Sequence, residues 1–437
     1  MNIIRMMKPN TAQPVRLRAP LRWWHRSTIA KDTVGACLQA NGTSPGSRQN
    51  GIVLMNTDRD HLLTAIAGAF SLVIALGIGR FLFTPALPDM IAETSLTAIS
   101  GGYLAAINYG GYLAGAMLAM AVPAHRARTA FWLALWASVI TSLLMGLSTT
   151  FTPWAINRFL AGVASAIIMV NGSALVLGAM PNHLRARLGN IHYAGIGLGI
   201  SIAALTVALI ESLRGSYATM WLACGALALI LLPLLRRIPA LPHAKHSQHE
   251  RAPVNRSALG FLIASYTLAG FGYITSTTYL PVIAKAQLPG LDSAAFYTWL
   301  AVGLAAVPAN LLWGKLASHT SERNALMAAL VVQALGVSAP AWLPGLTGLV
   351  VSGLLVGGTF TAVVALSMYC GRQLAPHAAS AALGALTACY GVGQILGPVV
   401  TARLLESSGS FAPGLLGAAA ALIGASVLLV PLGKVRF

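Results

Sequence analysis

Twelve apolar stretches, each long enough to cross a lipid bilayer, follow one another between residues 61 and 432. A membrane-spanning helix needs about 20 mostly apolar residues, and only helices and closed barrels satisfy all their backbone hydrogen bonds within lipid. The stretches are continuous and lack the short alternating pattern of barrel strands. We therefore expect an all-α membrane protein with twelve transmembrane helices. They are placed at residues 61–87, 99–121, 129–148, 153–180, 189–210, 217–235, 257–282, 293–313, 324–343, 346–369, 380–405 and 411–432.

The composition excludes most soluble and nucleic-acid-binding proteins. Of the 437 residues, 56% are hydrophobic and 9% are charged, whereas soluble proteins carry about 25% charged residues. A net charge of +18 is high enough for a nucleic-acid-binding protein, but the basic residues lie in short loops between apolar stretches, so we expect no nucleic-acid partner. The four cysteines are far apart and form no CxxC pair, so we expect neither a zinc site nor a disulfide framework. We also expect no cofactor.

Lys and Arg are distributed unevenly between the two sides of the membrane. The loops after the even-numbered spans carry most of them, whereas the loops on the opposite side carry only Arg214 and Lys285. Cytoplasmic loops are enriched in Lys and Arg. We therefore expect a multi-pass protein of the cell inner (plasma) membrane, with both termini in the cytoplasm.

Residues 1–60 differ from the rest of the chain, because they are polar and basic and hold no apolar run of a secretory signal. We interpret them as a disordered cytoplasmic extension. Two alternatives stay open: residues 16–26 lie on an anionic membrane surface, or translation begins naturally at Met55.

The two halves of the chain repeat one another. The residues Gly77, Gly79, Thr84, Leu87 and Pro88 of the first span recur, at one constant offset, as Gly270, Gly272, Thr277, Leu280 and Pro281 of the seventh. Segments six spans apart have the same orientation, so the duplication is parallel. We expect an N-terminal six-helix bundle at 61–235, a cytoplasmic linker at 236–256 and a C-terminal six-helix bundle at 257–437.

Three segments resemble the major facilitator superfamily (MFS). The loop Gly314–Arg323 is similar to the superfamily's loop signature, although its counterpart between spans 2 and 3 has no aspartate. Arg158 to Gly162 is similar to an RxxxG signature, and the run from Gly77 to Pro88 resembles the YbfB/YjiJ-type subgroup. The resemblance implies the MFS fold and small-molecule transport by alternating access around a central cavity.

Arg80 is a cation inside the first span. An arginine within a membrane costs about 3 kcal/mol or more unless it meets water, a partner or a ligand. We expect it to face a water-accessible hollow between the bundles. It contacts an anionic group on the cargo, pairs with Asp89, Glu93 or backbone carbonyls, or modulates a carboxylate in proton coupling. Arg158 lies at a similar depth in span 4. Three roles stay open for it: coupling or gating, cargo binding, or support of the structure.

The other polar residues of the spans supply further candidates. We assign substrate binding to Arg80, Thr84, Asn108, Tyr109, Tyr273, Thr277 and Gln394, and coupling or gating to Arg158, Asp89 and His192. The alternative role for Asn108 and Gln394 is hydrogen bonding between helices. The alternative for His192 is a structural role as a neutral imidazole. Glycine pairs at 111/115, 195/199 and 393/397 serve either a rocking motion or static packing.

These observations predict a secondary active transporter of a small organic solute, preferably an anion, driven by a proton gradient. Its partners are then a small-molecule substrate, protons and the lipid bilayer, and the protein acts as a monomer. The alternatives are an efflux carrier for hydrophobic compounds and a membrane sensor that keeps the fold without transporting. The sequence shows no convergent cluster of catalytic residues, so we do not expect an enzyme.

Overall fold

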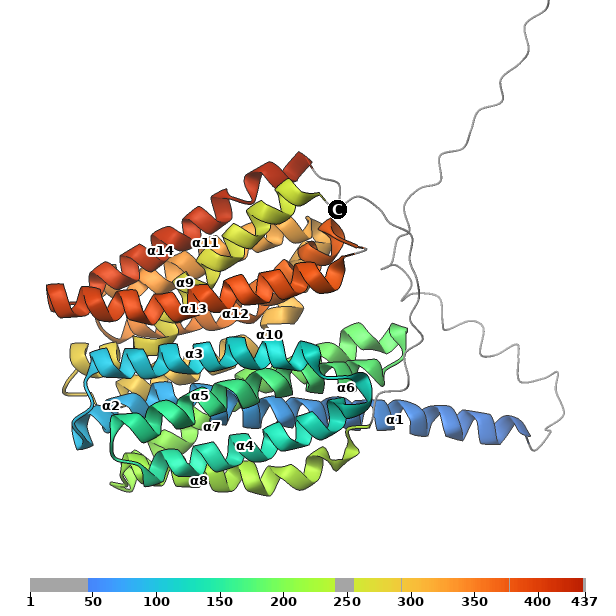
Figure 1. Cartoon of the computed structure of the whole chain (residues 1–437), viewed down its shortest axis with the longest axis horizontal. Helices are drawn as coiled ribbons and strands as arrows, with labels where there is room; N and C mark the ends of the chain where they lie inside the picture. Colours follow the sequence, from blue (N-terminus) through green and yellow to red (C-terminus); the bar gives the residue numbers. More distant parts are fainter. Residues whose placement is uncertain (1–45, 240–254, 292, 377, 435–437) are drawn as a thin grey trace, which may run out of the picture. The chain divides into compact units, whose positions relative to one another are not determined.

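The computed structural model of the protein describes residues 46–239, 255–291, 293–376 and 378–434. Residues Asp58–Phe437 form one compact unit. The regular structure of the described residues is helical throughout (Figure 1). Within them, twelve helices are long and apolar enough to cross a membrane, from Asp58–Glu93 to Ala412–Leu432. This confirms the expected all-α fold with twelve spans.

The first six spans are built from helices α1 to α8, and the last six from α9 to α14. The first set comprises α1 (Gly46–Leu72), η1 (Val73–Phe81), α2 (Phe83–Glu93), α3 (Ala98–Ala121), α4 (Ala127–Leu147), α5 (Phe151–Ile167), η3 (Ile168–Gly172), α6 (Ser173–Gly178), α7 (Asn182–Ser212) and α8 (Tyr217–Leu231). The second set comprises α9 (Arg256–Gln287), α10 (Ala294–His319), α11 (Glu322–Trp342), α12 (Gly345–Leu374), α13 (Ala379–Ser408) and α14 (Ala412–Val427).

The first helix begins earlier than its hydropathy suggests. Helix α1 starts at Gly46, whereas we expected the first span from residue 61. Residues 1–45 of the expected extension and residues 240–254 of the expected linker lie outside the described part of the chain. The bundle boundaries therefore stay a prediction.

The first span is the most enclosed of the twelve. In its most apolar 18-residue window 78% of the residues are buried, against 39% to 61% in the other spans of the described residues. Many large apolar side chains on the other helices are exposed instead, for example Leu133 and Trp136 on α4. Such a surface suits lipid, which solvates apolar side chains. The first span therefore runs through the interior of the protein.

The first span contains a π-helical segment, η1, between α1 and α2. In a π-helix the carbonyl of one residue bonds to the N–H five residues later. For Arg80 that residue is Pro85, which has no N–H. The carbonyl of Arg80 is therefore free to accept a hydrogen bond from a donor on another helix.

The two halves meet mainly along two helix pairs, α3 with α13 and α7 with α10, and α2 also contacts α9. Figure 1 shows α3 and α13 running side by side. The backbones of α7 and α10 come close together at Gly197 and Gly303, since a Cβ atom on Gly303 would lie 2.6 Å from the Ser201 nitrogen. No larger residue fits at this crossing without moving a helix.

The glycine pairs pack helices within one half. Gly111 faces the backbone of Phe159, Gly195 faces the backbone of Ala69, and Gly393 faces the Thr267 carbonyl. Of the two roles expected for the glycine pairs, these contacts favour static packing over a rocking motion between the halves. The glycines at the crossing of α7 and α10 lie between the halves instead.

Candidate functional site

Arg80 lies near the end of η1 and is only 5% exposed. Its guanidinium carbon lies 5.3 Å from the centre of the Phe81 ring, 4.8 Å from that of Tyr109 and 4.5 Å from that of Tyr112. A cation over an aromatic ring is stabilised by about 2 kcal/mol when both are shielded from water. The expectation of an open, watery hollow at Arg80 is wrong for this structure, because aromatic rings enclose the guanidinium.

One edge of the Arg80 guanidinium has nothing to bind. Its Nε and Nη2 atoms have no hydrogen-bond partner among the described residues. These two groups point their hydrogens in the same direction, along the edge that pairs with both oxygens of a carboxylate or phosphate. The acids expected as partners are engaged elsewhere. Asp89 binds Lys285, and Glu93 accepts the backbone N–H of Tyr217.

Arg158 on α5 supplies the donor that the π-helical segment needs. It is 1% exposed. Its Nη2 donates to the Arg80 carbonyl at 3.2 Å and its Nη1 to the Gly79 carbonyl at 3.1 Å. Its guanidinium carbon also lies 4.6 Å from the centre of the Phe83 ring. This geometry favours the structural role among the three roles left open for Arg158.

A row of aromatic rings begins beside Arg80 and continues into the second half. Phe81 meets Phe360 of α12 edge to face, with ring centres 6.0 Å apart. Phe360 stacks on Tyr273 of α9 at 5.9 Å, and Tyr273 stacks on Tyr390 of α13 at 5.8 Å. Tyr390 in turn stacks on Tyr266 at 4.2 Å. We call Tyr266, Tyr273, Phe360 and Tyr390 the aromatic stack; all four rings are buried.

The predicted amide and threonine residues lie on both sides of this region. Gln394 donates to the Tyr273 hydroxyl at 2.5 Å, and its Oε1 has no partner in the described part of the chain. Asn108 donates to the Arg158 carbonyl at 2.7 Å, which joins α3 to α5. Thr84 donates to the Thr277 carbonyl at 3.0 Å. Arg80, Tyr109, Tyr273 and Gln394 are thus linked through neighbouring rings, whereas Asn108, Thr84 and Thr277 form bonds between helices.

A second polar cluster joins the two halves where the first, fifth and seventh spans end. Lys285 of α9 contacts Asp89 of α2 at 3.0 Å and Glu211 of α7 at 2.7 Å. We call this end of the helices the Lys285 end. The Thr84 to Thr277 bond, which also crosses between the halves, involves the same helices α2 and α9.

His192 lies apart from Asp89 and Arg158. It is fully buried, and its Nε2 lies 3.0 Å from the Ser173 hydroxyl. It precedes Glu211 by nineteen positions on α7, about 29 Å along a helix. The structure therefore does not bring the three predicted coupling residues into one site.

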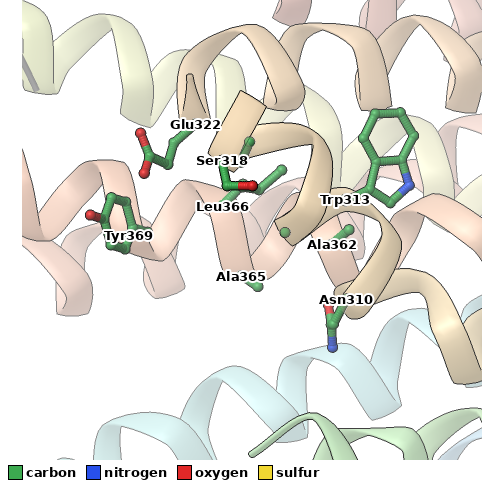
Figure 2. Close-up of a pocket in the computed structure, with 10 residues that line it drawn as sticks. Asn310, Trp313, Ser318, Glu322, Ala362, Ala365, Leu366 and Tyr369 are labelled. Carbon is green, nitrogen blue, oxygen red and sulfur yellow. The ribbon is translucent and has the colours of Figure 1, made fainter. Parts of the chain in front are cut away.

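A pocket of about 280 Å³ lies between α10, α11 and α12. Figure 2 shows Tyr369 and Glu322 at one end of it and Trp313 at the other. It borders the second half of α10, whereas Trp299, which packs on Phe81, lies near the start of that helix. None of the residues that line the pocket belongs to the aromatic stack.

Sequence reasoning missed Phe360, Tyr390 and Tyr112 as neighbours of the Arg80 region, and it missed Lys285 and Glu211 as partners of Asp89. The aromatic residues carry no local signal. Lys285 did carry a signal in the sequence. It is one of only two basic residues in the loops after the odd-numbered spans, and acidic residues lie at the span ends on that side of the membrane.

The fold and its buried cation define a class of protein. Twelve membrane-spanning helices, arranged as two parallel six-helix repeats, are the architecture of an MFS transporter. The chain belongs to the family described as "Uncharacterised MFS-type transporter YbfB", which matches residues 72–430. The chain is therefore a member of a family of membrane-embedded MFS-type transporters.

Two solved structures share this fold. The nucleoside transporter NupG superposes with a TM-score of 0.70 at 15% identity, covering 85% of this chain and 100% of that one. A bacterial homologue of the human lysosomal transporter Spinster, inward-facing and unoccupied, superposes with a TM-score of 0.60 at 15% identity, covering 85% and 95%.

Three curated relatives differ in what they are named for. Human solute carrier family 67 member A1 is 33% identical over 188 residues, which cover 40% of this chain and 43% of the relative. The benzoate transport protein of Acinetobacter baylyi is 25% identical over 176 residues, covering 38% and 37%. The class H tetracycline resistance protein of Pasteurella multocida is 22% identical over 377 residues, covering 81% and 92%. The matched part thus spans about two fifths of the first two relatives.

Proposed function

We propose that this protein is a secondary active transporter of small organic anions. The observation that carries the proposal is the free Nε and Nη2 edge of the buried Arg80 guanidinium, which has no partner in the described residues. A buried charge without a partner is strongly unfavourable, and this edge has the geometry that binds a carboxylate. An anionic substrate would supply the missing acceptors.

Alternating access would come from the two six-helix halves, 61–235 and 257–437, moving about the region of Arg80. In support of this, the Arg80 region includes residues of both halves, Phe81 from one and Phe360 from the other. A single chain contains both halves, so the working unit is proposed to be a monomer.

The distribution of Lys and Arg supports an orientation with both termini in the cytoplasm of the cell, in the inner membrane. In that orientation the Lys285 end faces outward. The ion pairs of Lys285 with Asp89 and Glu211 then hold the outer side closed. The structure would correspond to a state in which substrate leaves or enters from the cytoplasmic side.

Proton coupling is proposed to act at the same end. Protonation of Asp89 or Glu211 would remove one of the two ion pairs that join the halves there. Protons from outside would in this way favour opening toward the outside. His192, which bonds to Ser173, is the second candidate.

The test is uptake of radiolabelled organic anions into proteoliposomes that contain the full-length protein, with and without an inward proton gradient. We expect uptake to fall at least tenfold in Arg80→Gln. Uptake should be unchanged in the control Arg187→Gln, an exposed position. Equal uptake by a well-folded Arg80→Gln protein and the wild type would refute the proposal. A pH dye in the lumen reports coupling, because symport acidifies the lumen and uniport does not.

Efflux of hydrophobic compounds is the second candidate. It is favoured by the tetracycline resistance relative, which matches 81% of this chain. The two functions differ in their dependence on Arg80. Binding of tetracycline that is strong in the wild type and unaffected by Arg80→Gln would favour efflux.

A further inference from the structure

We propose that the transported anion is a flat aromatic acid, whose carboxylate binds the free edge of Arg80 and whose ring packs with the aromatic side chains beside it. This inference rests on the proposed function and names the substrate class of the same site. It is carried by the combination of an unpaired, buried guanidinium edge and a row of parallel rings that Phe81 connects to it.

Only one edge of the enclosed guanidinium lacks hydrogen-bond partners among the described residues. Phe81, Tyr109 and Tyr112 lie against it at 4.5 to 5.3 Å, so the atoms that lack partners, Nε and Nη2, are on its edge. A carboxylate that bonds to both atoms lies in the plane of the guanidinium. The rest of the ligand must then extend away from Arg80 among aromatic side chains.

The neighbouring rings present flat surfaces. Phe360 and Tyr273 are inclined by 3° to one another, and Tyr273 and Tyr390 by 8°. Phe81 links this stack to Arg80 through its contact with Phe360. Aromatic rings prefer offset stacks or edge-to-face pairs with other rings. A ligand ring that packs against these side chains can use either arrangement, face to face as within the stack or edge to face as between Phe81 and Phe360.

The stack would distinguish a flat ring from a puckered one. Benzoate and cyclohexanecarboxylate carry the same charge and the same number of carbons, but only benzoate has a planar π-system. Each aromatic pair contributes about 2- to 13-fold in affinity beyond simple burial. We therefore expect benzoate to bind about tenfold more tightly than cyclohexanecarboxylate.

The experiment measures both acids in competition for bound radiolabelled benzoate, using the full-length protein in lipid nanodiscs. Phe360→Leu and Tyr273→Leu should each bring the ratio of the two affinities toward one, because they remove a ring but keep an apolar side chain. Tyr297→Leu is the matched control, since Tyr297 is a 47% exposed aromatic residue on α10. It should leave the ratio unchanged.

The outcomes separate this inference from the proposed function. A preference for benzoate that is lost in Phe360→Leu supports the inference. Equal affinity for the two acids, with both lost in Arg80→Gln, overturns the inference and leaves the anion transporter standing. Binding of neither acid, together with Arg80-independent binding of an uncharged compound, overturns both.

Discussion

Replacing Arg158 tests whether this residue holds the first span in shape or takes part in transport directly. Its two bonds to the Arg80 and Gly79 carbonyls, at 3.2 and 3.1 Å, involve a charged donor. Such bonds contribute about 1.5 to 3 kcal/mol each, so their loss in Arg158→Met amounts to about 3 to 6 kcal/mol. Removal of a buried charge offsets part of this loss. We expect a net destabilisation of about 3 kcal/mol.

The assay is thermal unfolding of the purified protein, followed by tryptophan fluorescence. Trp154 is a suitable reporter, because it is buried on α5 one turn before Arg158 and donates to the Met145 carbonyl. For a chain of this size, 3 kcal/mol corresponds to a fall in melting temperature of about 3 °C. Arg158→Lys should be intermediate, since a lysine ammonium keeps the charge but lacks the planar, two-nitrogen fork of the guanidinium. The exposed Arg187→Met is the control.

One result would refute the structural role. If Arg158→Met melts at the wild-type temperature but no longer transports, the carbonyl contacts contribute little to stability. Arg158 would then have to act on the substrate or on coupling, as the sequence allowed.

Three further predictions concern the contacts between helices. Lys285→Met removes two partly exposed ion pairs that contribute about 1 kcal/mol each at most, so opening at the Lys285 end should rise up to about 30-fold. The readout is faster thiol labelling of a Met90→Cys reporter, and an unchanged rate would contradict the idea. Gly303→Val should reduce transport at least tenfold, because its Cβ would meet the backbone of α7. Gly417→Val is its control, since a Cβ atom there would meet no other described helix within 4 Å. His192→Gln should leave the pH profile of transport unaltered if His192 only bonds to Ser173; a shifted profile would assign it to coupling.

Hydropathy and repetition predicted the fold because lipid restricts the choice of structure. Thr84 and Thr277 are an example of what the internal repeat predicts. The constant offset identified them as equivalent, and the structure joins the side chain of one to the carbonyl of the other. Equivalent positions of a duplicated unit face each other near its symmetry axis, so the bond follows from the repeat.

The site was less predictable, because its neighbours come from distant segments. Arg80 was evident as a charge inside an apolar run. Its surroundings depend on how α9, α12 and α13 pack, and a tyrosine or phenylalanine within a span has no signal that assigns it to one side of a helix. The role of Arg158 depends on the π-helical segment, which ends at Phe81 and which hydropathy does not reveal.

The enclosure of η1 has a consequence for how the bilayer acts on this protein. All nine residues of the segment, Val73 to Phe81, are buried. Acyl chains therefore do not touch the segment that carries Arg80, and changes in their length or saturation should leave the intrinsic affinity of that site unaltered. Membrane thickness can still act on the exposed outer helices, such as α4 with Leu133 and Trp136. A thinner bilayer should thus change how fast the carrier cycles without changing what it selects.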